Sequence, residues 1–425
     1  MKKVLNNNNI LKMTTNVIEI NDDYYCHELN ITVENNAVQY LTNSLSYDIY
    51  FRKYLRNNTP CVIKSATNSW PCRRKWLSND APNFEYLKQV FGSSVAPVAD
   101  CTTKYYNSQM KNDMTIDDYI DYWIAYRDNS YADNKPILYL KDWHCVKNNP
   151  TIPIYDVPSY FASDWLNEYY TENEKFNDDY MFVYMGPKGT WTPFHADVFS
   201  SYSWSANIVG KKRWVLFEPG EEDGLRDRYG QLIYDITSQE LQDKNIYPKY
   251  NEDDLKRYEI IQNPGEIVFV PSGWHHQVWN LEDTISINHN WINACNIWNV
   301  WICLKKELFA VMREVDDCRD MDDWDDHCQL MLKASYGINY IEFYHFLSYL
   351  VVKRISMIRE DNPVISFGRW YLGRNHCLYD LKQIRIVLED MIEEAKAKCI
   401  NTIVFSEKDP RLLVSEINEL LLPSR

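Results

Sequence analysis

A histidine and a carboxylate stand two residues apart at His195 and Asp197. On an extended strand, residues i and i+2 leave the same face, so this imidazole and carboxylate would lie side by side. Such a pair supplies two of the three ligands in the two-histidine, one-carboxylate triad that holds non-haem Fe(II). The third ligand must come from another segment, and His275-His276 offers it. The sequence therefore predicts a metal site shared by two distant stretches.

The His-x-Asp pair alone is a weak signal, because a hydrogen-bonded strand histidine explains His195 equally well. Gly and Pro turns precede both stretches, which predicts His195 and His276 at strand starts near the mouth of a barrel. Lys212 follows Gly210 on an intervening strand and would pair with an anionic co-substrate, while Thr192 offers a hydroxyl donor. A 2-oxo acid and O2 would fill the open positions of Fe(II). Zinc is the alternative metal, since three protein ligands and a water also describe a catalytic zinc site.

Composition limits the classes of protein that fit. The 425 residues include 15 Trp, 32 Tyr and only 12 Gly, which indicates an aromatic-rich interior. A formal net charge of -15 argues against sequence-independent nucleic-acid binding and favours a basic partner. The 11 Cys show no zinc-type spacing, and neither a signal peptide nor a membrane-spanning run is visible. We therefore expect reduced thiols and a cytoplasmic location, with the nucleus as the second choice.

The distribution of apolar, polar and turn-forming residues along the chain predicts an α+β protein in four parts. Residues 1–20 form an Asn-rich leader that we expect to be disordered. Residues 21–177 mix short helices, such as 46–55 and 115–123, with strands near 93–100 and 136–141. Residues 178–292 are short strands broken by Gly and Pro, as in a jelly roll, with helix-prone acidic stretches at 238–245 and 251–255. Residues 293–425 are helical.

In the C-terminal region the sequence predicts a first helix that carries an apolar stripe. Further helices are predicted near 339–354, 378–398 and 412–421. The stripe follows the spacing of one helix face and comprises Ile297, Trp301, Leu304, Leu308, Val311 and Val315. It suits packing within the chain and also a homodimer through these helices.

Three motifs together resemble the core of JmjC-domain 2-oxoglutarate oxygenases. They are Thr192-x-x-His195-x-Asp197, Gly210-Lys-Lys-Arg-Trp-x-Leu-Phe217 and Gly265-Glu-x-x-Phe-Val-Pro271-x-Gly-Trp-x-His276. The resemblance runs from about residue 60 to about residue 301. It implies a cupin-like double-stranded β-helix flanked by helices, with Fe(II) as cofactor and 2-oxoglutarate and O2 as co-substrates.

The resemblance also implies roles for single residues. His195, Asp197 and His276 would be the iron ligands. His276 is preferred because family members commonly have Trp-Trp-His where this chain has Trp274-His275-His276, so His275 would only pack or hydrogen-bond nearby. The residues that would bind 2-oxoglutarate are Thr192, Lys212, Asn288 and Ser205, although local hydrogen bonding within the strands is an equal alternative for Asn288 and Ser205.

The residues within and around these motifs resemble those of the branch of the family that hydroxylates the eukaryotic translation release factor. This implies C4-hydroxylation of the lysine in the release factor's Asn-Ile-Lys-Ser motif, with an effect on translation termination. No partnership with nucleic acid or membrane is expected. A histone lysine demethylase shares the same core and is the second interpretation. A non-catalytic barrel that serves as a binding module is the third.

Overall fold

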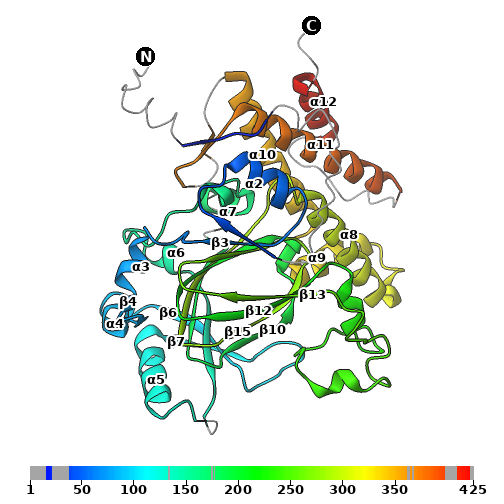
Figure 1. Cartoon of the computed structure of the whole chain (residues 1–425). Coiled ribbons are helices and arrows are strands. Elements are labelled where there is room, and N and C mark those ends of the chain that lie inside the picture. Colours follow the sequence, from blue (N-terminus) through cyan, green and yellow to red (C-terminus); the bar gives the residue numbers. More distant parts are fainter. Residues whose placement is uncertain are drawn as a thin grey trace, which may run out of the picture.

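The larger of the two sheets that form the barrel runs through both the N-terminal region and the centre of the chain (Figure 1). The computed structural model describes residues 16–21, 38–132, 135–173, 176, 178–360, 364–365, 368–397 and 409–421. In spatial order the strands of this sheet are β2 (Gln39–Thr42), β3 (Cys61–Lys64), β14 (Ile267–Val270), β11 (Tyr202–Val209), β16 (Thr284–Trp291), β9 (Met181–Gly186), β8 (Leu138–Trp143), β6 (Val95–Asp100) and β7 (Lys111–Thr115). The predicted strands near 93–100 and 136–141 are confirmed as β6 and β8. Because β8 pairs with β9, the sheet is continuous across the predicted division at residue 178.

The smaller sheet lies opposite the larger one, across the interior of the barrel. Its strands, in order, are β10 (Trp191–His195), β15 (His275–Asn280), β12 (Lys212–Phe217) and β13 (Arg257–Gln262), all antiparallel. Side chains bridge the two sheets: the Lys212 ammonium on β12 donates to the Ser286 hydroxyl on β16. The two sheets therefore enclose a barrel interior, as the sequence predicts.

Alternation along β11 and β16 makes one wall of the barrel interior polar. One face of these strands carries Trp204, Ala206, Ile287 and Trp291, which are fully buried in the main hydrophobic core. The opposite face carries Ser203 and Ser205 on β11 and, in register with them, Asn290 and Asn288 on β16. Because side chains alternate along a strand, the apolar face fixes the register and turns this polar row toward the smaller sheet.

Short helices flank the sheets on the N-terminal side. They are α2 (Tyr47–Tyr50), which continues as the π-helix η2 (Phe51–Leu55), α3 (Pro71–Lys75), α4 (Phe84–Phe91), α5 (Ile116–Asp128), α6 (Cys145–Asn148) and α7 (Trp165–Glu172). The predicted helix at 46–55 is therefore present as α2 and η2. The predicted N-cap of α5 is confirmed, because the Thr115 hydroxyl accepts a hydrogen bond from the Asp118 amide at 3.1 Å.

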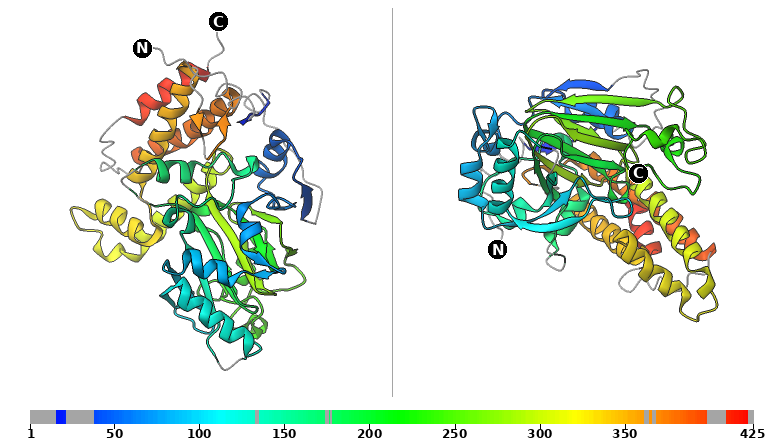
Figure 2. Two further views of the ribbon diagram at one scale, coloured as in Figure 1. Left: turned by 90° about the vertical axis from the view of Figure 1, so that its left-hand side faces the viewer. Right: turned by 90° about the horizontal axis from the view of Figure 1, so that it is seen from below.

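The C-terminal helices gather on one side of the sheets (Figures 1 and 2). They are α8 (Ile297–Glu314), α9 (Trp324–Tyr336), α10 (Tyr340–Glu360), α11 (Arg374–Ala397) and α12 (Pro410–Leu421). The four predicted helices are confirmed as α8, α10, α11 and α12, whereas α9 was not predicted. A buried ion network fastens them to α7: the Arg354 guanidinium donates to both Glu168 oxygens at 2.7 and 3.0 Å and to Asp380 at 3.0 Å. None of the described helices has the length and apolar run that a membrane crossing requires.

The apolar stripe of α8 packs inside the chain. Ile297, Trp301, Leu304 and Leu308 are buried, and the Trp301 ring stacks on Phe343 of α10 with centroids 5.8 Å apart. A homodimer through the C-terminal helices therefore would use other side chains, and it stays a prediction.

Two expectations need correction. The end of the predicted disordered leader is ordered, because β1 (Val17–Ile18) pairs with β18 (Tyr371–Leu372), and Ile18 and Ile20 are buried against the core. Residues 1–15 lie outside the described residues. The acidic stretch from 238 to 255 forms only one short 3-10 helix, η6 (Gln239–Gln242), and is otherwise turns around Leu241 and its apolar neighbours.

Candidate metal centre

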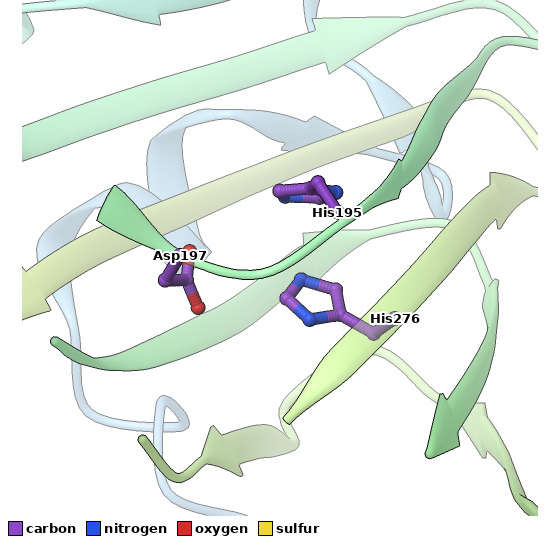
Figure 3. Close-up of side chains that lie close together, drawn as sticks. All are labelled: His195, Asp197 and His276. Carbon is purple, nitrogen blue, oxygen red and sulfur yellow. The ribbon is translucent and has the colours of Figure 1, made fainter. Parts of the chain in front are cut away.

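His195, Asp197 and His276 converge at one end of the smaller sheet (Figure 3). His195 pairs with His276 across β10 and β15, and a bulge between Thr192 and His195 adjusts the register. One ligand atom from each of the three side chains lies within 4.8 Å of the others. His195 is the last residue of β10, so its predicted place at a strand start is wrong. His276 does lie near the start of β15, and antiparallel pairing brings the end of one strand to the start of the other.

Both imidazoles are oriented by backbone carbonyls. His195 Nδ1 lies 2.8 Å from the Pro193 carbonyl, and His276 Nδ1 lies 3.0 Å from the Trp274 carbonyl. A carbonyl only accepts, so Nδ1 carries the proton in each ring and Nε2 keeps its lone pair. Burial, and then the neighbouring His276, lower the pKa of His195 to about 4, so this ring is neutral at neutral pH. Neutral imidazole is the form that binds a metal ion.

The Asp197 carboxylate is held by two donors from the larger sheet. Ser203 Oγ donates to Oδ2 at 2.7 Å, and Asn290 Nδ2 donates to Oδ1 at 3.1 Å. Ser203 and Asn290 are directly opposite each other on β11 and β16. Groups that orient a ligand in this way normally contribute to metal affinity.

Replacing Ser203 by alanine is expected to weaken metal affinity by about tenfold, because Asp197 loses one of its two orienting hydrogen bonds. Titration of the full chain with Mn²⁺ measures this affinity. Ser238→Ala, which removes a hydroxyl at the start of η6, is the matched control. Equal affinities in the two variants would show that the Ser203 hydroxyl does not orient the carboxylate.

Lys212 lies deeper in the barrel than the three converging side chains. It begins β12 four residues before Leu216, which pairs with His276, so the two positions are about 13 Å apart along the strand. Its ammonium is 2.8 Å from the Ser286 hydroxyl and 3.5 Å from the Tyr139 hydroxyl. Burial, and then the charge of Lys141, lower the pKa of Lys212 to about 7.

The other predicted co-substrate residues lie on the same interior walls. Thr192 pairs with Val278 of β15. Lys212 pairs with Asn280, which is two residues further along β15 and on the same face as Val278. Ser205 and Asn288 are register partners on the larger sheet. The Asn288 side chain donates to the Ser286 hydroxyl at 3.2 Å, and the buried Ser205 hydroxyl has no hydrogen-bond partner among the described residues. The structure thus brings Ser205 and Asn288 to the wall that contacts the Lys212 ammonium.

Sequence reasoning missed several polar residues of the interior. They are Tyr139, Lys141, Gln109, Ser203, Ser286 and Asn290. The signal for Ser286 and Asn290 is visible in the chain, because a polar residue stands at every second position from 284 to 290. Tyr139, Lys141 and Gln109 carry no comparable signal, since they enter the barrel from the N-terminal region.

His275 faces away from the barrel interior, as the neighbour of His276 on a strand must. Its Nδ1 lies 3.2 Å from the Gly273 carbonyl and 3.8 Å from a Glu222 carboxylate oxygen, and burial lowers its pKa. The predicted packing role of His275 agrees with these contacts.

A cavity of about 980 Å³ opens beside the converging side chains. Its walls include His195 and Asp197, and α8 and α9 contribute Ile302 and Tyr336. The charged residues on its walls besides Asp197 are Glu222, Glu307, Arg226 and Lys306. The cavity is large enough for an extended side chain together with part of a peptide backbone.

Comparison with known proteins agrees with this geometry. The model of a cupin-like domain matches residues 48–297. The chain is 47% identical over 380 residues to 2-oxoglutarate and iron-dependent oxygenase JMJD4 of Mus musculus, covering 87% of this chain and 88% of the relative. The Homo sapiens protein of the same name is 45% identical, covering 88% and 89%. Arginine-specific demethylase JMJ20 of Arabidopsis thaliana is 42% identical over 320 residues, covering 72% and 68%.

Proposed function

Because the chain belongs to the JMJD4 family of 2-oxoglutarate and iron-dependent oxygenases, we propose that it hydroxylates a lysine in a protein substrate. We further propose that the substrate is the eukaryotic translation release factor and the target is C4 of the lysine in its Asn-Ile-Lys-Ser motif. The convergence of His195, Asp197 and His276 beside an open cavity is the observation that carries the proposal.

The three converging side chains fit Fe(II). Two neutral imidazoles and one carboxylate are the donor set of the facial triad, and each donor here has its own orienting partner. His195, Asp197 and His276 would hold the iron. When bound, iron and 2-oxoglutarate supply oxidative chemistry, in which O2 is activated as the co-substrate is decarboxylated to succinate. Lys212, Thr192, Ser205 and Asn288 would bind the co-substrate deeper in the barrel.

Charge supports a basic protein substrate. The support comes from the net charge of the whole chain, -15; the walls of the cavity beside the metal centre carry two glutamates, Glu222 and Glu307, and two basic residues, Arg226 and Lys306. An acidic enzyme attracts a lysine-containing segment electrostatically, which raises the rate of encounter. A substrate in the translation machinery would place the enzyme in the cytoplasm, with the nucleus as a second location.

Demethylation of a protein side chain is the second candidate. The chain is similar to a relative named as an arginine-specific demethylase, and a histone lysine demethylase, which shares the same family core, is the second interpretation of the resemblance. Demethylation uses the same centre, because oxidation of an N-methyl carbon has the same requirements as oxidation of a side-chain carbon. The two candidates differ in which carbon lies beside the metal.

Mass spectrometry of three peptides separates the candidates. The full chain, Fe(II) and 2-oxoglutarate are incubated with a release-factor peptide, a methylated lysine peptide and a methylated arginine peptide. Gain of one oxygen atom on the release-factor lysine is the expected result, and the Asp197→Ala variant is the control. An unmodified release-factor peptide together with loss of methyl from either other peptide would overturn the proposed hydroxylation.

A further inference from the structure

A second buried ammonium lies beside Lys212. Lys141 on β8 is 6% exposed and shares the inward face of the strand with Tyr139, two residues earlier. Its ammonium donates to the Gln109 side-chain oxygen at 2.7 Å and lies 5.2 Å from the centroid of the Tyr139 ring. Within the described part of the chain it forms no ion pair; the nearby Asp142 carboxylate pairs instead with Lys111 and with the Tyr184 hydroxyl.

A buried ammonium whose hydrogen-bond acceptor is a neutral amide is costly, because an amide replaces little of its lost hydration. The pKa of Lys141 falls to about 8, chiefly through burial. Its charge also acts on Lys212, so two like charges oppose each other in one region of the barrel. A bound anion removes this penalty for both groups.

Contacts place the two ammonium groups around one aromatic ring. The Tyr139 hydroxyl is 3.5 Å from the Lys212 ammonium, and the ring of the same residue contacts Lys141. Gln109 links Lys141 to the smaller sheet, because its Nε2 donates to the Trp191 carbonyl at 3.2 Å, next to Thr192 on β10. The charge of Lys141 also reaches His195. Through Tyr139 and Gln109, Lys141 is therefore connected to Lys212 and to the strand that carries Thr192.

We propose that Lys141 is a second co-substrate cation, which together with Lys212 stabilises the bound 2-oxoglutarate dianion, and that Gln109 positions it. A dicarboxylate is opposite in charge to both buried ammonium groups. The proposal rests on the 2-oxoglutarate dependence of the family and is independent of which protein side chain is oxidised.

Equilibrium binding tests the proposal without turnover. The affinity of the full chain for 2-oxoglutarate is measured by calorimetry with Mn²⁺ as the metal, for the wild type, Lys141→Met and Lys141→Arg. Lys141→Met removes the charge at similar volume, and we expect it to weaken binding by at least about tenfold. Lys141→Arg keeps the charge and is expected to recover part of the loss. Lys211→Met is the matched control, since Lys211 pairs with Glu282 on the exposed side of the barrel.

Thermal unfolding separates a co-substrate cation from a structural lysine. Because the unliganded protein buries an uncompensated charge at Lys141, the Lys141→Met variant is expected to have a Tm no lower than the wild type without ligand. Its gain in Tm on adding 2-oxoglutarate should be smaller than that of the wild type. A Tm several degrees lower without ligand, or an affinity for 2-oxoglutarate within twofold of the wild type, would overturn the proposal.

Discussion

Replacing Asp197 by alanine is expected to lower 2-oxoglutarate turnover by more than about 1,000-fold while leaving the fold intact. The expectation follows from the loss of the single anionic ligand, since stabilisation by a bound metal ion is worth several kcal/mol in the transition state. The fold should persist because the Asp197 side chain is hydrogen-bonded to Ser203 and Asn290 and lies outside the three hydrophobic clusters. Succinate formation and iron content, measured on the purified full chain, check the two halves of the prediction.

His195→Ala is expected to behave in the same way, because it removes another ligand of the same ion. His327→Ala is the matched control, since His327 lies on α9 away from the three converging side chains. Circular dichroism and Tm establish that each variant is folded. Wild-type iron content or turnover in both Asp197→Ala and His195→Ala would remove the assignment of this site.

The iron-binding triad could be predicted from the sequence because its signal is local. His195 and Asp197 lie on one short segment, and the turn before His276 repeats the pattern of glycine and proline followed by histidine. The barrel was equally visible, since short strands between turns leave few other architectures. The position of His195 on its strand was predicted incorrectly: β10 continues through a bulge between Thr192 and His195, and His195 is its last residue. A bulge depends on the partner strand and has no signature in one strand alone.

Residues that enter the site over long sequence distances could not be predicted. Tyr139 and Lys141 reach the barrel because β8 pairs with β9 and extends the larger sheet, a pairing that no local pattern specifies. Their apolar neighbours made the segment look like an ordinary buried strand. The same reason explains the end of the leader: Val17 and Ile18 pair with β18, more than 350 residues later in the chain, and no local pattern predicts that pairing.

Replacing Lys212 by methionine is expected to weaken 2-oxoglutarate binding by about 100-fold, since loss of one partner of a buried charge pair typically costs a few kcal/mol. The unliganded variant should be at least as stable as the wild type. The reason is that the fold buries the Lys212 ammonium against two hydroxyl groups without a carboxylate partner in the described part of the chain. Calorimetry with Mn²⁺ and thermal unfolding measure the two effects, and Lys211→Met again serves as control. Weaker binding together with a lower Tm in the absence of ligand would indicate a structural role instead.

The same lysine makes co-substrate affinity depend on pH. In the free protein the pKa of Lys212 is about 7, and a bound carboxylate raises it, because the anion favours the charged form. Above pH 7 binding must therefore take up a proton, and the affinity of the wild type should fall by up to about tenfold per pH unit. Lys141, with a pKa of about 8, adds a second proton at higher pH. The pKa of His195 is about 4, so this ring does not titrate in that range. In Lys212→Met the fall in affinity should begin about one pH unit higher and be less steep.

The stability of the unliganded wild type should change with pH in the opposite sense. The pKa of Lys212 is lower in the folded protein than in the unfolded chain, so the unfolded chain binds more protons above pH 7 and the fold gains stability as pH rises. We therefore expect ligand affinity to fall and unliganded stability to rise with pH, and we expect Lys212→Met to reduce both slopes. A buried lysine whose charged form binds an anion should give this combination.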